Sequence, residues 1–140
     1  MRKIVMSLAG VLFIGGVASA GVPSPAALHH HTQSSVASAM HKAHEERALI
    51  DIQLAEAEAK AGKVASAEKA AAHAIQQLHE AIALHQHHSQ LHQHHHTHLT
   101  TALNDLKAAE KQFHTGHVGT AEKDLAKAAH QIREALKHHQ

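Results

Sequence analysis

Apolar residues recur at intervals of three and four positions along most of the chain after residue 34. This spacing places them on one face of an α-helix and polar side chains on the other. Four such stretches predict an all-α protein with helices at about residues 35–61, 64–88, 97–114 and 118–139. Their apolar stripes contain, in chain order, Ala48, Ile52, Ala55 and Ala59; Val64, Ala67, Ala71, Ile75, Leu78 and Ile82; Ala102, Leu106, Ala109 and Phe113; and Val118, Ala121, Leu125, Ala128, Ile132 and Leu136.

Two glycines mark the points where helices are expected to end. Gly62 follows the first stretch and Gly116 follows the third, and each is followed within two residues by another amphipathic stretch. Glycine just past a helix end readily adopts the left-handed conformation that closes the helix. We therefore expect a tight helical hairpin at each glycine.

The two hairpins are related by an internal repeat. A shift of 54 residues aligns 41–85 with 95–139, and 18 of the 45 positions are identical, including both glycines. We interpret this as a duplicated helical hairpin. Two such hairpins bury their apolar stripes most simply as an up-down-up-down four-helix bundle over residues 35–140, because short turns make consecutive helices antiparallel.

The first twenty residues, MRKIVMSLAGVLFIGGVASA, have the pattern of a cleaved export signal. Arg2 and Lys3 are followed by an apolar run that is short for a membrane span, and then by the small-residue site Ala18-Ser19-Ala20. We expect cleavage after Ala20 and a location in the periplasm or outside the cell. Residues 21–34 carry both prolines and three histidines and are expected to form a flexible leader.

Composition argues against several classes of function. The 140 residues include no cysteine, which rules out disulfides, thiolate ligands and a lipid-attachment cysteine in this sequence. Removal of the first twenty residues leaves 11 Lys and Arg against 12 Asp and Glu. This balance is not typical of a nucleic-acid-binding protein, and no later segment is apolar enough to suggest a membrane partner after signal cleavage.

Histidine is the outlier of the composition, with 20 residues. In an up-down-up-down bundle, the first and third helices begin at the same pole at which the second and fourth helices end. Most of the histidines fall at this pole, which we call the histidine pole: His41, His44, His79, His85, His87, His88, His92, His94, His95, His96, His98, His138 and His139.

Four of these histidines extend the apolar stripes into the histidine pole. Counting at helical spacing along each stripe reaches one core-facing histidine per helix, namely His41, His85, His95 and His139, with His44 and His98 beside them. On the first helix the stripe also passes through Glu45. A solvated and chemically idle loop would explain the histidine density of residues 84–99, but not this core-facing alignment.

Converging imidazoles suit Cu(II), Zn(II) or Ni(II), and copper has the highest intrinsic affinity of the three. We therefore predict that the histidine pole binds divalent metal ions, with Cu(II) as the first choice and Zn(II) or Ni(II) next. Further ions could bind to residues 84–99, which also include His87, if this segment is helical. Its pairs at i, i+4 spacing are His88 with His92, His92 with His96, and His94 with His98.

The second hairpin resembles the small metal-binding protein family, which comprises exported bacterial histidine-rich helical bundles. The resemblance rests on the turn HTGHVG, residues 114–119, and on the following TAEKDLAKAAHQIREALKHH, and it is clearest over roughly 25 to 45 residues. It implies binding of copper and other divalent ions for buffering or tolerance. Carried onto this chain, it favours as ligands His114, His117, His130, His138 and His139. Here, however, Lys123, Lys127 and Arg133 occupy polar positions of the last helix, and the first hairpin has GKVA in place of GHVG.

An enzyme and a pH-responsive bundle are the two other classes of function. Di-iron bundle enzymes use Glu-x-x-His on two helices, and this spacing occurs nowhere in the chain, so we expect no enzyme activity. A pH-responsive structural or interaction bundle is the alternative, because clustered imidazoles become charged together on mild acidification. The alanine-rich core also predicts a monomer or a weak homo-oligomer that covers exposed apolar surface.

Overall fold

The computed structural model describes residues 25–85 and 93–139, with side chains placed for residues 35–84 and 93–139. This part of the chain forms four α-helices and contains no strand. They are α1 (Pro25–Lys60), α2 (Val64–His85), α3 (Gln93–His114) and α4 (Val118–Lys137). The prediction of an all-α four-helix bundle is therefore confirmed.

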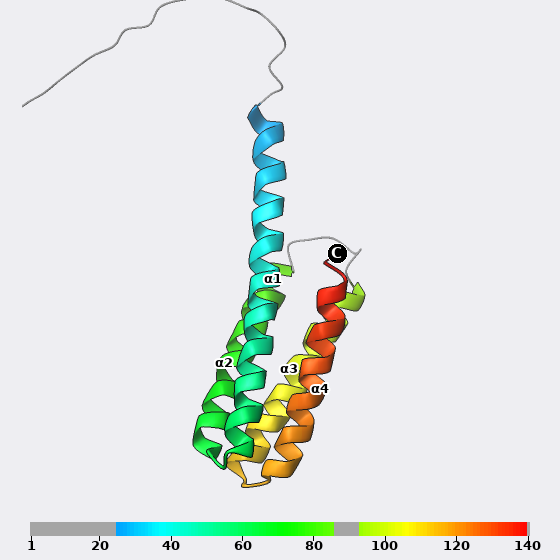
Figure 1. Ribbon diagram of the computed structural model, residues 1–140. Coiled ribbons are helices and arrows are strands. Elements are labelled where there is room, and N and C mark those ends of the chain that lie inside the picture. The colour runs from blue at the N-terminus through cyan, green and yellow to red at the C-terminus, as the bar shows by residue number, and fades with distance from the viewer. Residues whose placement is uncertain (1–24, 86–92, 140) are drawn as a thin grey trace, which may run out of the picture.

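The helices are arranged as two antiparallel hairpins that pack side by side (Figure 1). α1 packs mainly on α2 and α3 mainly on α4, while contacts of α2 with α3 and of α1 with α4 close the bundle. The two hairpin turns lie at one end. The C-terminal end of α4 and the beginning of α3 lie together at the other end, beside the middle of the longer α1.

The two hairpin turns have the same structure. Gly62 and Gly116 have positive φ angles of 76° and 80°. The amide after each glycine donates a 2.8 Å hydrogen bond to a carbonyl five residues earlier, from Lys63 to Glu58 and from His117 to Gln112. This is the Schellman closure that a left-handed glycine permits, and it explains why the repeat retains both glycines.

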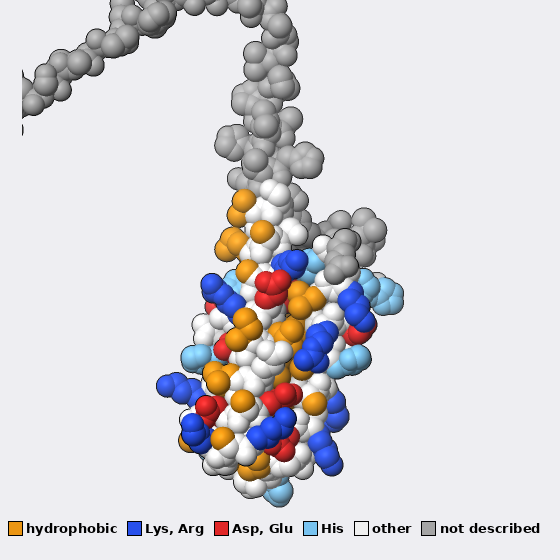
Figure 2. All heavy atoms as spheres, viewed as in Figure 1, with side chains coloured by type: hydrophobic (Ala, Val, Ile, Leu, Met, Phe, Trp, Pro, Cys, Tyr) orange, Lys and Arg blue, Asp and Glu red, His pale blue; other side chains and the backbone are white. Residues whose placement is uncertain are grey.

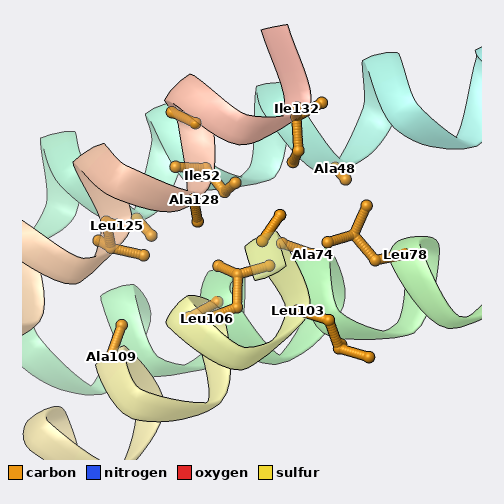
Figure 3. Close-up of a cluster of buried hydrophobic side chains, with 14 of the residues drawn as sticks. Ala48, Ile52, Ala74, Leu78, Leu103, Leu106, Ala109, Leu125, Ala128 and Ile132 are labelled. Carbon is orange, nitrogen blue, oxygen red and sulfur yellow. The ribbon is translucent and has the colours of Figure 1, made fainter. Parts of the chain in front are cut away.

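The core is built from the predicted apolar stripes and is rich in alanine. Ile52, Leu78, Leu106, Leu125 and Ile132 supply its largest fully buried apolar side chains, together with Leu99. Figure 3 shows several of these side chains, together with core alanines, pointing into the space between the four helices. No described helix combines the length and the apolar character required to cross a membrane.

Two helices begin earlier than the sequence analysis expected. α1 starts at Pro25 rather than near residue 35, so the expected flexible leader is helical from residue 25. Proline suits the first turn of a helix because its fixed φ is already helical and its missing N–H is not needed there. α3 starts at Gln93 rather than at residue 97, and the Thr97 hydroxyl donates to the Gln93 carbonyl. The expected signal peptide lies outside the described residues.

Candidate metal centre

Three histidines and one glutamate come together inside the histidine pole. His41 and Glu45 lie one turn apart on α1, His95 lies in the first turn of α3, and His139 follows the end of α4. One potential ligand atom from each residue lies within 4.8 Å of every other. We call this group the buried His/Glu cluster, and its arrangement could hold a metal ion.

The Glu45 carboxylate is the centre of the cluster. Its Oε1 atom lies 3.0 Å from Nδ1 of His41 and 2.8 Å from Nε2 of His95. The same oxygen is 3.2 Å from Nε2 of His139, which hydrogen-bonds to it. The three imidazole rings pack around it with centroid separations of 4.8 to 5.2 Å. A single carboxylate oxygen thus faces nitrogen atoms from α1, from the first turn of α3 and from the residues that follow α4.

The cluster is almost completely removed from solvent. Glu45 is 0% exposed, His95 is 3% exposed and His41 is 5% exposed, while His139 is half-buried at the rim. Burial raises the pKa of Glu45 from 4.5 to about 7, against the lowering effect of its hydrogen bond to His139. The carboxylate is therefore held close to the point at which it gains or loses a proton near neutral pH.

The second oxygen of the Glu45 carboxylate takes part in none of these contacts. Oε2 of Glu45 is buried and has no hydrogen-bond partner among the described residues. A buried carboxylate oxygen without a partner is costly, because its hydration is lost without replacement. A bound cation would compensate for this loss. Three imidazoles and one carboxylate also match the nitrogen and oxygen ligands of four-coordinate Zn(II) and related divalent ions.

Sequence reasoning placed three of these residues together but did not identify Glu45 as a ligand. His41, His95 and His139 were expected at the core-facing positions, and the structure brings them together. His85 ends α2, and its side chain lies outside the part of the structure that is described. A signal for Glu45 was present in the sequence, since it is a charged residue on the apolar stripe, one turn after His41.

Two further histidines near the cluster in sequence, His44 and His98, are hydrogen-bonded to glutamines. His44 Nδ1 lies 2.7 Å from Oε1 of Gln77, and His98 Nδ1 lies 2.7 Å from Oε1 of Gln131. These contacts are equivalent in the two copies of the hairpin and join α1 to α2 and α3 to α4. His44 also lies 3.1 Å from Oε2 of Glu80. These contacts link the helices that carry His41 and His95 to α2 and α4.

The remaining histidines singled out by sequence do not join the cluster. At the same pole, His94 and His138 are exposed and His96 is half-buried, and the ring of His138 stacks on that of His98 at 6.1 Å. At the far turn, exposed His114 lies 3.4 Å from Glu68, and exposed His117 contacts Thr115. His130 is exposed on α4. Outside the described residues lie His87, His88 and His92.

Comparison with known proteins adds no further assignment. No protein-family model matches the chain, and neither a curated protein nor a solved structure is significantly similar to it. The resemblance of the second hairpin to the small metal-binding protein family therefore stays a proposal. The geometry of the buried His/Glu cluster is therefore the basis for a functional proposal.

Proposed function

We propose that this protein reversibly binds divalent transition-metal ions at the buried His/Glu cluster. The observation that carries the proposal is the convergence of His41, Glu45, His95 and His139 on one buried point. The four donor atoms come from both hairpins, so an ion bound there would bridge the two halves of the bundle. Its role would be buffering, sequestration or tolerance of metal rather than catalysis.

The chemistry of the ligands supports a divalent ion of intermediate softness. Neutral imidazoles bind copper, zinc and nickel well, and an ionised carboxylate favours a divalent cation. Ligand atoms around a tetrahedral Zn(II) ion lie about 3.3 Å apart, as bond lengths near 2.0 Å require. The cluster atoms, already within 4.8 Å of one another, need only small movements to reach this arrangement. Copper is our first choice on intrinsic affinity, followed by zinc and nickel.

The proposal includes export to the periplasm or beyond after signal cleavage. It is supported by the N-terminal sequence, which has the pattern of an export signal. Because the chain has no cysteine, imidazole and carboxylate are its strong metal ligands. The exposed histidines near the cluster, such as His94 and His138, would add weaker binding at the surface. Release would follow acidification, because protons compete with metal for imidazole and carboxylate.

The test is calorimetric titration of the metal-free protein with Cu(II), Zn(II) and Ni(II) separately. We expect one tight ion in the cluster and additional weaker ions. The conservative variant Glu45→Gln and the double variant His41→Ala/His95→Ala should each lower the affinity for the tightly bound ion at least tenfold, because each removes cluster ligands. Nitrogen couplings in the spectrum of bound Cu(II) should identify imidazole ligation.

A matched control removes exposed histidines that lie away from the cluster. The triple variant His114→Ala/His117→Ala/His130→Ala keeps the cluster intact. It should still bind one ion tightly and should lose part of the weaker binding. If this control abolishes tight binding and the Glu45→Gln variant leaves it unchanged, the proposed site is wrong. Circular dichroism of each variant establishes that the helices are retained.

A pH-responsive bundle is the second candidate function. The specific observation in its favour is a buried glutamate with a pKa of about 7 that is surrounded by three histidines. Under this alternative, acidification would change the packing of the histidine pole in the absence of metal. A measurement on the metal-free protein in a chelator distinguishes the two candidate functions. Only a pH-responsive bundle should then show a cooperative structural change between about pH 8 and 5.

A further inference from the structure

α1 carries a second apolar stripe on the face opposite the core. Its large members are Val36, Met40, Ile50 and Leu54, which are 49% to 61% exposed. With exposed Ala43, Arg47 and Ala57 they follow alternating steps of four and three residues. We call these seven residues the outer seam. Figure 2 shows hydrophobic side chains along α1 on the face in view.

The duplicated hairpin provides an internal comparison for this face. In α3, the positions equivalent to Met40, Ala43, Arg47, Ile50, Leu54 and Ala57 are occupied by His94, Thr97, Thr101, Asn104, Ala108 and Lys111. The two helices share their core stripe, but only α1 is apolar outside it. Packing of the bundle therefore does not require an apolar outer seam, and another contact must account for it.

The shape of α1 limits what this contact can be. The alternating four and three spacing is that of a two-helix coiled-coil seam, which calls for a helix as the partner. α1 also continues beyond His41 to Pro25, past the ends of the other helices (Figure 1), and Val36 belongs to this continuation. A partner helix must be long enough to reach both the projecting part and the bundled part of α1.

We propose that the outer seam binds the outer seam of a second copy of this protein, with the two α1 helices antiparallel. One register pairs all the large apolar residues. Val36 packs against the partner's Leu54, Met40 packs against the partner's Ile50, and Arg47 faces the small side chain of the partner's Ala43. The projecting part of each α1 is thereby covered by the partner's bundle, which lies on the opposite side of the paired helices.

Charge repulsion favours this orientation over a parallel one. In a parallel pair with two-fold symmetry, each seam residue meets its own copy, so the two Arg47 guanidinium groups would be forced together. In the antiparallel register each Arg47 faces the small side chain of the partner's Ala43 instead, and the two arginines are displaced from each other along the helix axes.

The first test is the mass of the metal-free protein in a chelator, measured by light scattering over a range of concentrations. We expect a dimer at about 100 µM. The variant Ile50→Asn/Leu54→Ala, which gives α1 the residues of α3, should weaken dimerisation at least tenfold because four apolar side chains per dimer are lost. The control Asn104→Ala on α3 should leave the dimer unchanged. A wild-type protein that is monomeric at this concentration overturns the proposal.

The second test uses the absence of natural cysteine to establish the register. A chain with Met40→Cys and a chain with Ile50→Cys should form a disulfide with each other under mild oxidation. Each chain alone should form little, because in the antiparallel register neither position meets its own copy. Preferential linkage of Ile50→Cys chains to themselves would indicate parallel helices, and the absence of any linkage would indicate no dimer through this face. Either result contradicts the proposal.

The third test places a charge opposite Arg47. Ala43→Arg should weaken the dimer by placing like charges together across the interface, and the double variant Ala43→Arg/Arg47→Glu should restore it. Failure of the double variant to recover overturns the assigned pairing. None of these measurements involves a metal ion, so their outcome is independent of the proposed metal binding.

Discussion

Glu45 and Leu99 occupy the same position in the two copies of the hairpin, and both are completely buried. Leu99 therefore shows that an apolar side chain can occupy the position equivalent to Glu45. We expect Glu45→Leu to stabilise the metal-free protein by about 1–4 kcal/mol near pH 8, because it replaces a buried carboxylate by an apolar side chain. Urea unfolding in a chelator measures this difference, and titration should show that tight metal binding is lost.

The matched control for this variant is its exposed neighbour. Glu46→Leu adds the same side chain on the surface of the same helix and should change the free energy of unfolding by no more than about 0.5 kcal/mol. A marked loss of stability in Glu45→Leu under metal-free conditions would show that the carboxylate holds the three imidazoles together even without an ion.

The pKa of Glu45 leads to a prediction about pH. The pKa of this carboxyl is about 7 in the folded protein, above its ordinary value of 4.5, so the folded protein binds the proton more tightly than the unfolded chain. The stability contributed by this group is fully present below about pH 4.5 and is lost as the pH rises through about 7. The metal-free wild type should therefore lose up to about 3 kcal/mol relative to Glu45→Gln over this range.

Unfolding of both proteins in a chelator at several pH values tests this prediction. The comparison with Glu45→Gln removes contributions from titratable groups that do not contact residue 45. A difference between the two proteins that is constant with pH, or that grows in favour of the wild type as the pH rises, would contradict the raised pKa.

The two histidine–glutamine contacts should contribute equally to the free energy of unfolding. His44 with Gln77 and His98 with Gln131 have the same separation in sequence and the same 2.7 Å distance. We expect Gln77→Ala and Gln131→Ala each to reduce the free energy of unfolding by about 1 kcal/mol, and the double variant to show the sum. Strongly unequal effects in denaturant unfolding would mean that the two hairpins use this contact differently.

Replacement of glycine by alanine should change the stability of the protein in opposite directions at different positions. Gly62→Ala and Gly116→Ala should each destabilise the protein by about 1 kcal/mol or more, because both glycines have positive φ although an added Cβ would meet no atom within 4 Å. Gly119→Ala should instead stabilise it by up to about 1 kcal/mol, because this glycine lies inside α4 with open space around it. Thermal unfolding of the three variants compares these effects directly.

The fold could be predicted from the sequence because several independent patterns agree. The apolar stripes specify four helices, the glycines specify two turns, and the repeat requires both hairpins to fold alike. The start of α1 was misplaced because two prolines suggested a loop, although Pro25 is compatible with the first turn of a helix. Hydrophobic periodicity carries no information about a helix that continues beyond its bundle.

The site was only partly predictable. Helical spacing identified the direction in which His41 and His95 point, since this depends on the helix alone, and the same spacing pointed to His139, although this residue follows the end of α4. The role of Glu45 depends on how closely α1, α3 and the end of α4 approach one another, which spacing within one helix cannot reveal. A charged residue on an apolar stripe was the available signal, and its partners lie 50 and 94 residues away along the chain.

The single glutamate among duplicated histidines also bears on ancestry. Before duplication, a lone hairpin could have built such a centre only as a symmetric homodimer, in which every ligand appears twice. A glutamate at this position would then have placed two carboxylates in one buried site, where their mutual repulsion is severe. Gene fusion removes that constraint, because the two copies can then change separately. One copy could acquire Glu45 while the other kept an apolar residue at position 99.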